Sequence, residues 1–504
     1  MDFTKIYNSV SIILPEIAIA AFLVIILLVD LIWAKNKKAI PFVALAGTFV
    51  SLYFVLVQID FNGFAFSKMV GSAENYGLVA IDAFGSFFKV LILVATISVI
   101  LFSYSSDEIK KSVDRLGEYY VLIFGMVLGM FLMVSASDLI LIYLSLELLS
   151  LSSYVLAGFT KLRDRNSEAA LKYFIYGAIS SGLMLFGISL FYGLTGSTNL
   201  YVINSLLQAP QINALTLIVA TILVFVGIGY KISAAPFHFW TPDVYEGAPI
   251  TITAFLSVAS KAAGFALLIR FVKTTFLDSI NPSGHWQMNG LFPWKELLAV
   301  ISILTMTLGN FSALWQNNLK RMLAYSSIAH AGYLLLGLVV LSNQGLTAIL
   351  IYLAIYAFMN LGAFFIVMLI ANKIGSEDIE DYRGLGYSTP FLGVALGMFL
   401  ISLIGLPPSA GFIGKLYLFI ALIDSNMITL AVIAILNTVI SLFYYIRVLK
   451  EMFLAKPSTK VEPFRVSVFN IIVVTILLAP IVIFGVYFTP VVDFAKNCVT
   501  IFGL

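Results

Sequence analysis

Long apolar runs alternate with short polar segments along the whole chain. Because about 20 apolar helical residues cross the hydrocarbon core of a bilayer, about fourteen of these runs predict membrane-spanning helices. Their expected limits are 12–33, 40–58, 79–102, 119–136, 139–159, 168–194, 212–240, 248–271, 296–315, 322–341, 346–371, 390–423, 428–452 and 466–488. The longest polar stretches, 103–118, 371–389 and 455–465, leave no room for an attached soluble domain. The pattern predicts an all-α polytopic membrane protein.

The composition supports the bilayer as solvent. Of the 504 residues, 61% are apolar and 11% are charged, against about 45–50% and about 25% in soluble domains. Only helices and closed barrels span a bilayer, and the runs are too long for barrel strands of about 10 residues. The first run, 12–33, is also too long for a signal-peptide core, so we expect it to be a retained helix.

Lysine and arginine gather in every second loop. The basic loops and their edges hold Lys35, Lys37, Lys38, Lys110, Lys111, Arg115, Lys161, Arg163, Arg165, Lys320, Arg321, Lys373, Arg383, Arg447, Lys450, Lys456, Lys460 and Arg465. In the loops between them, Lys68, Lys273 and Lys295 are the exceptions. Because positive loops stay in the cytoplasm, this alternation predicts both termini on the non-cytoplasmic side.

Proline interrupts two of the runs. Pro236 lies in span 7 and the Pro407–Pro408 pair lies in span 12, so both helices are expected to break. Paired broken helices indicate an inverted-repeat transporter. The five-span separation predicts two inverted five-helix repeats, spans 4–8 and spans 9–13. The expected divisions are 1–118 with helices 1–3, 119–271 for the first repeat, 272–452 for the second repeat, and 453–504 with span 14.

Several ionisable groups lie inside spans, at a cost of about 2.5–3.5 kcal/mol each on insertion scales. Glu147 lies near the middle of span 5, Lys231 and Lys261 lie deep in spans 7 and 8, and Lys415 follows the break in span 12. Ion pairs that fix helix packing are one explanation and proton transfer is the other, which we favour. For Lys172 the sequence leaves two interpretations open, proton transfer or a side chain that only extends to the interface, because it closely follows a charged loop.

Burial disfavours the charged form of a lysine and a nearby carboxylate favours it, so moving a partner charge would load or unload a proton. His238, two residues after Pro236, and His330 in span 10 could also relay protons near neutral pH. Neutral histidines that are hydrogen-bonded in the interior are the alternative. Asp30 and Arg270 lie near span ends and are expected at the interface, whereas Lys89 lies in the first part of span 3.

Other chemistry is not expected on this chain. One cysteine, Cys498, cannot form an internal disulfide, a zinc site or an iron–sulfur site. The sequence holds no dinucleotide fingerprint and no phosphate loop. We therefore expect no metal, no redox cofactor and no nucleic-acid partner, with any redox chemistry carried out by a partner protein.

The order of these residues resembles that of a known family. The chain resembles the antiporter-like membrane subunits of respiratory complex I, the proton-pumping NADH–quinone oxidoreductase. The shared features are a glutamate in span 5, lysines in spans 6, 7 and 8, and two proline-broken spans, one with histidine and one with lysine. The stretch 231–247, with Phe-His-Phe-Trp-Thr-Pro-Asp-Val-Tyr-Glu-Gly, is the most specific part. Among these subunits the chain most resembles subunit N, the subunit 2 family. It lacks the lateral helix of the L type, and it has Lys415 where the M type usually has glutamate.

The resemblance implies a role for each residue. Glu147 and Lys172 would form a charged pair that responds to a neighbouring subunit, and Lys231 would be the central proton carrier. His238 and Lys261 would pass protons laterally, and Lys415 would lead to the exit. NADH, flavin, iron–sulfur clusters and quinone would belong to other subunits of the complex. The expected setting is a bacterial inner membrane, with other complex I membrane subunits as partners.

Three alternatives follow from the same residues. A subunit of a multi-subunit sodium/proton antiporter or of a membrane-bound hydrogenase would use the same lysines, and its co-purifying partners would differ. A non-catalytic scaffold would use them as structural ion pairs. A transporter of an organic solute ranks last, because such sites combine half-helix ends with substrate-specific polar groups.

Overall fold

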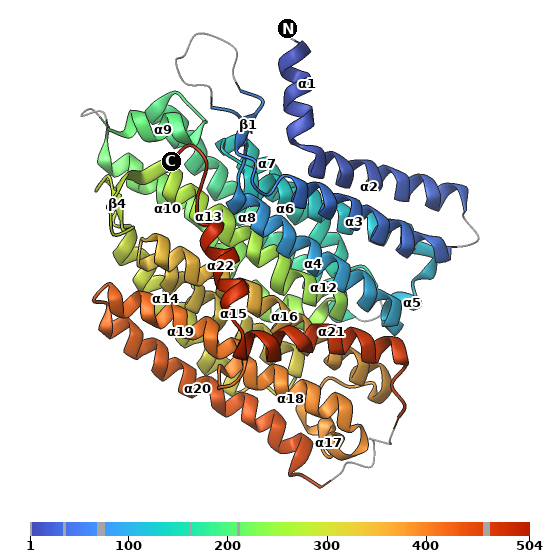
Figure 1. Ribbon diagram of the computed structural model, residues 1–504. Helices are drawn as coiled ribbons and strands as arrows, with labels where there is room; N and C mark the ends of the chain where they lie inside the picture. The colour runs from blue at the N-terminus through green and yellow to red at the C-terminus, as the bar shows by residue number, and fades with distance from the viewer. Residues whose placement is uncertain (1–2, 34–36, 68–75, 161–163, 209–211, 457–463) are drawn as a thin grey trace.

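The computed structural model describes residues 3–33, 37–67, 76–160, 164–208, 212–456 and 464–504, as a bundle of roughly aligned helices (Figure 1). Within them, thirteen helical stretches are long and apolar enough to cross a membrane. Their helices are α2 (Leu14–Ile32), α3 (Ile40–Val57), α4 (Ala83–Ser105), α6 (Leu116–Ser135), α7 (Leu139–Ala157), α8 (Asp164–Thr195), α10 (Ala214–Ile232), α12 (Ile250–Phe255) with α13 (Lys261–Phe276), α14 (Trp294–Leu314), α15 (Leu319–Val339), α16 (Asn343–Ile374), α20 (Ile428–Phe453) and α21 (Val468–Val486). The one remaining predicted span, span 12 (390–423), is divided between α18 (Pro390–Ile404) and α19 (Ala410–Asp424). The predicted all-α membrane architecture is therefore confirmed.

Short polar side chains begin many of these helices. Asp82, Asp138 and Asn318 each accept hydrogen bonds from backbone N–H groups in the first turn of α4, α7 and α15, respectively. Such N-caps satisfy donors that have no partner within the helix, which matters most where no water is present. The ends of the spans are thus fixed by residues that the hydropathy pattern does not single out.

The two predicted breaks are present. α10 ends at Ser233 (φ 60°), and the short helix α11 (Trp240–Gly247) follows it. α18 ends at Gly405 (φ 85°), and α19 begins five residues later. Both C-caps are left-handed, a conformation that ends a helix and that glycine adopts without strain. Each break lies a few residues before the proline that predicts it.

The two predicted five-helix units share a long helix that packs beside a broken one. α8 and α16 occupy equivalent places in their units, and each has 32 residues. α8 packs against α10, and α16 packs against both α18 and α19, so in each unit the long helix lies beside the broken one. This arrangement agrees with the predicted repeats. The residue limits proposed for the four divisions of the chain stay a prediction.

Several short elements were not predicted, because they are too short for a periodic pattern. They are α1 (Phe3–Ile12), α5 (Asp107–Lys110), α9 (Leu200–Leu207), α17 (Leu385–Ser388), α22 (Thr489–Asn497), the 3₁₀ turns η1 (Lys37–Ala39), η2 (Val113–Arg115) and η4 (Ile379–Tyr382), and the antiparallel pairs β1 (Gly63–Ala65) with β2 (Val79–Ile81) and β3 (Leu277–Ile280) with β4 (Trp286–Met288). One further element is a five-residue π turn, η3 (Leu256–Ser260), between α12 and α13.

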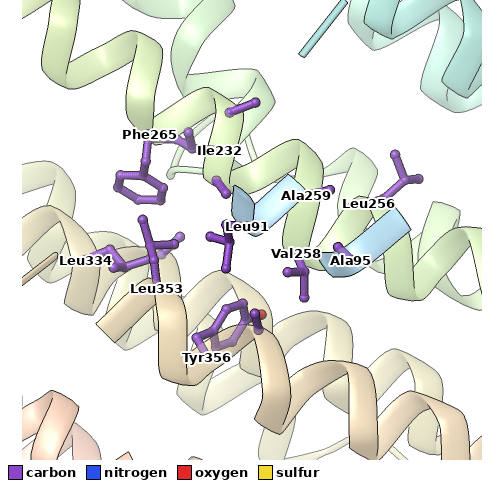
Figure 2. Close-up of a cluster of buried hydrophobic side chains, with 14 of the residues drawn as sticks. Leu91, Ala95, Ile232, Leu256, Val258, Ala259, Phe265, Leu334, Leu353 and Tyr356 are labelled. Atoms are coloured by element: carbon purple, nitrogen blue, oxygen red, sulfur yellow. The ribbon is translucent and has the colours of Figure 1, made fainter. Parts of the chain in front are cut away.

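The core lies where the two units meet. The stretches 250–276, 319–339 and 343–374 are almost wholly buried, whereas α2 and α21 at the periphery have few fully buried side chains. Figure 2 shows apolar side chains of α4, η3 and α13 facing those of α15 and α16, among them Leu91, Val258, Phe265, Leu334 and Leu353. This packing excludes water from most of the contact, so polar groups in it need protein partners.

One end of the bundle carries most of the described basic loops, and we call it the basic face. α4 and α16 end there and α6 and α21 begin there, next to Lys110, Arg115, Lys373 and Arg465. The predicted loop residues Lys35, Lys68, Lys161, Arg163 and Lys460 lie outside the described residues.

Arg270, which was expected near the interface, and Lys89 of span 3 each form a structural ion pair. Arg270 is fully buried and donates to both carboxylate oxygens of Asp82, at 2.9 and 2.8 Å, which corrects its interfacial placement. Lys89 lies 2.6 Å from Glu16, with both side chains buried. Sequence position suggests an interface for Arg270, but its partner comes from a helix that is distant along the chain. Asp30 pairs with the half-buried Lys37 at a span end, as expected.

Candidate functional site

Lys231 lies in the last turn of α10, directly before the first break, and it is fully buried. Its Nζ is 3.3 Å from the hydroxyl of Ser150 and 3.4 Å from that of Tyr173. Both partners are neutral, so among the described residues no charge in direct contact holds the lysine in its ionised form. A lysine in such surroundings can exist with or without its extra proton, as a proton carrier must.

Glu147 lies one turn before Ser150 on α7. Residues three apart share a helix face, so the carboxylate lies on the face of α7 that contacts Lys231. Its Oε1 is buried and has no hydrogen-bond partner among the described residues. A buried carboxylate oxygen without a partner is costly, which keeps Glu147 among the candidate functional groups.

Lys172 does not pair with Glu147, which corrects the expected pair. Its Nζ contacts Asp243 of α11 and Glu168 of its own helix, both at 2.7 Å, and its side chain is 38% exposed. The physical reason is location: Lys172 lies in the first turns of α8, beside the acidic groups of the basic face. Sequence spacing cannot reveal Asp243 as a partner, because the break brings α11 to this place.

Lys261 follows the π turn η3 directly. Its Nζ donates to the hydroxyl and to the carbonyl oxygen of Ser327 on α15, both at 2.5 Å. The hydroxyl of Tyr356 donates to the same Ser327 Oγ at 2.8 Å. π turns interrupt regular α-helices and often occur at functional sites. Here the turn precedes the lysine that joins the two units.

Lys415 lies in α19, just after the second break. Its Nζ donates to the carbonyl oxygen of Ile404 at 2.8 Å and lies 4.6 Å from the centre of the Tyr333 ring. Ile404 is the last residue of α18. Its carbonyl is therefore one of the last four of the helix, which have no hydrogen-bond partner within the helix. The break therefore creates the acceptor that holds the lysine.

A ladder of polar residues on α15 connects Lys261 with Lys415. Ser327, His330 and Tyr333 are spaced three apart, so they follow one helix face. His330 Nδ1 is 2.5 Å from the hydroxyl of Tyr352, and its Nε2 is 3.3 Å from that of Tyr445. Lys261 contacts one end of this ladder and Lys415 the other. The ladder thus offers groups that can bind and release protons between the two lysines.

His238 differs from the other candidates. It lies in the first break and stacks on the exposed Phe239 (ring centroids 4.5 Å apart). Its Nδ1 is buried without a hydrogen-bond partner among the described residues. The structure therefore brings it to the break that follows Lys231, but within the described residues it makes no direct contact with a lysine.

Tyrosines and serines are the residues of the candidate site that sequence reasoning missed. Ser150, Tyr173, Ser327, Tyr352 and Tyr356 hold Lys231, Lys261 or His330 directly or through one hydroxyl. The available signal was the three-residue spacing of Ser-Ile-Ala-His-Ala-Gly-Tyr on α15. The other serines and tyrosines do not stand out in the hydropathy pattern, because apolar spans contain many side chains with neutral hydroxyl groups.

A charged network lies at the basic face, around a cavity of about 210 Å³. Arg321 donates to Asp243 at 2.7 Å and to Glu246 at 2.8 Å, and Arg165 is 3.0 Å from Glu246. Burial alone would raise the pKa of the Asp243 carboxyl, but hydrogen bonds from Lys172 and Arg321 outweigh burial and hold that pKa below its ordinary value. The network joins the broken helix of the first unit to α15 of the second.

Metal-binding groups do not gather in the described parts of the chain: nowhere in them do three or more His, Cys, Asp or Glu side chains come together as a metal site would require. The arrangement that remains is a series of buried, proton-binding groups linked by neutral hydroxyls.

Comparison with known proteins gives a consistent result. The model of the family described as "NADH:quinone oxidoreductase/Mrp antiporter, TM" matches residues 136–441. The NADH-quinone oxidoreductase subunit N 2 of Chloroherpeton thalassium is 46% identical over 503 residues, covering 98% of this chain and 96% of the relative. A chain of respiratory complex I from Thermus thermophilus superposes with a TM-score of 0.76 at 30% identity, over 96% of this chain and 99% of that one. A chain of the Mrp complex from Dietzia, at 19% identity and a TM-score of 0.82 over 98% and 97%, shares the fold alone.

Proposed function

Since this chain belongs to the NADH:quinone oxidoreductase/Mrp antiporter transmembrane family, we propose that it carries protons along Lys231, Lys261 and Lys415. It is a multi-pass membrane subunit of a bacterial proton-translocating NADH–quinone oxidoreductase and works together with the other membrane subunits of that complex. The energy comes from quinone reduction, and NADH, flavin, iron–sulfur clusters and quinone bind to other subunits.

One observation carries this proposal. Lys261 and Lys415 contact opposite ends of the α15 ladder, at Ser327 and at Tyr333, with His330 between them. Within the described part of the chain, each of these two lysines is held by a hydroxyl or a carbonyl and not by a carboxylate, so losing its proton does not break an ion pair. Structural ion pairs look different, as the contact of Arg270 with Asp82 illustrates.

The proposed path begins at the basic face, which positive loops assign to the cytoplasm, and both termini then lie on the opposite side. A proton reaches Lys231 near Glu147, passes to Lys261, and moves along α15 to Lys415 and out at the far side. The ionisation of Glu147 sets how strongly Lys231 holds its proton, because a nearby negative charge favours the ammonium form. His238 would act beside Lys231 at the break, and Lys172 would act through the charged network.

The antiporter and hydrogenase alternatives have less support. The relative with 46% identity over nearly the whole chain has the name of a quinone oxidoreductase subunit, whereas the likeness to an Mrp chain is one of fold. The set of co-purifying subunits separates these possibilities directly.

Lys231→Ala tests the proposal in the native membrane. NADH-driven quinone reduction and proton uptake into inverted vesicles are measured after assembly of the complex has been checked. Lys450→Ala, at an exposed position of the basic face, is the matched control. We expect the complex with Lys231→Ala to assemble while proton uptake and coupled turnover collapse. Wild-type rates for both would show that the buried lysines are structural.

A further inference from the structure

A second, larger cavity lies at the basic face, away from the lysine path. Its volume is about 420 Å³, within the range of about 300–1,000 Å³ typical of ligand sites. The end of α4, the end of α16 and the start of α21 surround it, and in Figure 1 the end of α4 and the start of α21 lie together at one edge of the bundle. Ends of membrane-spanning helices lie at the depth of lipid headgroups.

The cavity has an excess of positive charge. Lys110, Lys373 and Arg465 line it, together with Asp107 as the acidic residue. Lys110 lies 3.7 Å from Asp107, so these two charges offset one another. Lys373 and Arg465 have no ion-pair partner among the described residues, and both are exposed. Two cations without a counter-charge at the mouth of one cavity favour an anionic ligand.

The inner wall is polar and already ordered. Asn372 donates to the carbonyl oxygen of Ser105 at 2.9 Å, and the Ser105 hydroxyl donates to Asn470 at 2.6 Å. These bonds tie the ends of α4 and α16 to the first turn of α21. The wall is therefore a fixed surface of amide and hydroxyl groups, suited to the glycerol and phosphate oxygens of a ligand.

The outer wall is apolar and continues into the surface that faces lipid. Tyr104, Leu369 and Phe469 line the cavity, and the Tyr104 ring is largely exposed. Beyond them α21 presents Ile472 and Ile476, both exposed, along its length. A ligand with an anionic head in the cavity could thus lay apolar chains along α21.

We propose that this cavity binds the headgroup of an anionic glycerophospholipid, with Lys373 and Arg465 contacting the phosphate. Basic pockets between helices at the cytoplasmic side are suited to such headgroups, and a guanidinium matches phosphate geometry in two-point contacts. Inorganic phosphate shares the charge but cannot use the apolar wall. The apolar continuation along α21 is the reason for choosing the lipid.

The test uses the intact complex, purified in detergent, in which retained lipids are counted by mass spectrometry. The wild-type complex is compared with a Lys373→Gln/Arg465→Gln double variant, and with Lys111→Gln/Lys450→Gln, two exposed lysines of the same face, as control. We expect the double variant to retain roughly one phosphatidylglycerol fewer per complex than wild type and control. Equal retention in all three would overturn the proposal.

Two further measurements separate the other occupants. In the first, a photoreactive amino acid replaces Tyr104 in an otherwise unchanged chain, and the complex is illuminated in vesicles of phosphatidylglycerol and phosphatidylcholine. We expect the adduct to have the mass of phosphatidylglycerol, and an adduct with a neighbouring subunit would overturn the assignment. In the second, binding of inorganic phosphate to the purified complex is measured. The assignment would also be overturned if phosphate bound and required Lys373 and Arg465 while no phosphatidylglycerol was retained.

Discussion

The ammonium group of Lys415 donates a hydrogen bond to the carbonyl oxygen of Ile404, which is 2.8 Å away. Ile404 is the last residue of α18, the helix that ends at the second break. The lysine thus completes the backbone hydrogen bonding of a helix end inside the bundle. It also holds a proton beside Tyr333 of the polar ladder. These two roles, one structural and one in proton transfer, can be separated by choice of substitution.

Replacement of Lys415 by glutamine should abolish proton uptake while the complex stays stable. The glutamine amide can still donate to the Ile404 carbonyl but cannot carry a proton. Lys415→Ala should lose proton uptake and also stability, by about 1–3 kcal/mol, because it leaves a buried carbonyl without a partner. Proton uptake into vesicles and the thermal unfolding midpoint are measured for both. Unchanged uptake with glutamine would exclude Lys415 from the path.

Removing the Ser327 hydroxyl should slow proton transfer without abolishing it. In Ser327→Ala the backbone carbonyl still holds Lys261, but the link to the Tyr356 hydroxyl is lost. We expect the pumping rate to fall severalfold, well short of the roughly 100-fold loss typical of removing an acid–base group. Ser302→Ala, which removes a buried hydroxyl bonded to the Gly332 carbonyl, is the control and should leave pumping unchanged. A complete loss at Ser327 would make it an obligatory carrier.

The charged network should contribute modestly to stability and respond to acid. Because the folded pKa of Asp243 is below its ordinary value, its stabilisation is fully present at neutral pH. It is lost as the pH falls below about 4. Asp243→Asn and Arg321→Gln should each lower the unfolding midpoint, with a coupling of about 1 kcal/mol or less in a double-mutant cycle. A stability profile of Asp243→Asn identical to wild type through acid pH would contradict this.

The thiol of Cys498 should resist alkylation in the folded chain. Burial raises its pKa to about 12, helped by the negative charges of Asp60 and Asp82, so almost no thiolate forms at neutral pH. The Tyr201 hydroxyl holds the following segment by donating to the Phe502 carbonyl at 2.5 Å. Tyr201→Phe should therefore increase the rate of maleimide labelling. Fast labelling of the wild-type complex would show that this segment is not docked.

Hydropathy and proline positions predicted the spans and both breaks, because these depend on local properties of the chain. They also singled out Lys231, Lys261 and Lys415, since a charge inside an apolar run is conspicuous. The partners could not be predicted. Ser150 contacts Lys231 across 81 positions, and Asp82 contacts Arg270 across 188. Such contacts arise only when the helices pack.

Lys172 illustrates the limit of reasoning by resemblance. Its position in α8 agrees with the expected span, but its partners are Asp243 and Glu168. The positions of residues around one helix do not reveal which distant segment of the chain packs against that helix. The short helix α11, which brings Asp243 to Lys172, exists because span 7 is broken, and its direction after the break depends on tertiary packing.

The π turn at Leu256–Ser260 has a consequence for how the length of this chain can vary. A π turn contains one residue more than the α-helical turn it replaces, and each residue of an α-helix adds about 100° of rotation. Deleting one residue within the turn would restore a regular helix and leave Lys261 facing Ser327. The same deletion in the neighbouring α12 or in α15 would rotate one partner away from the other. In this part of the core, the π turn is thus where the chain can lose a residue while keeping the direction of its lysine.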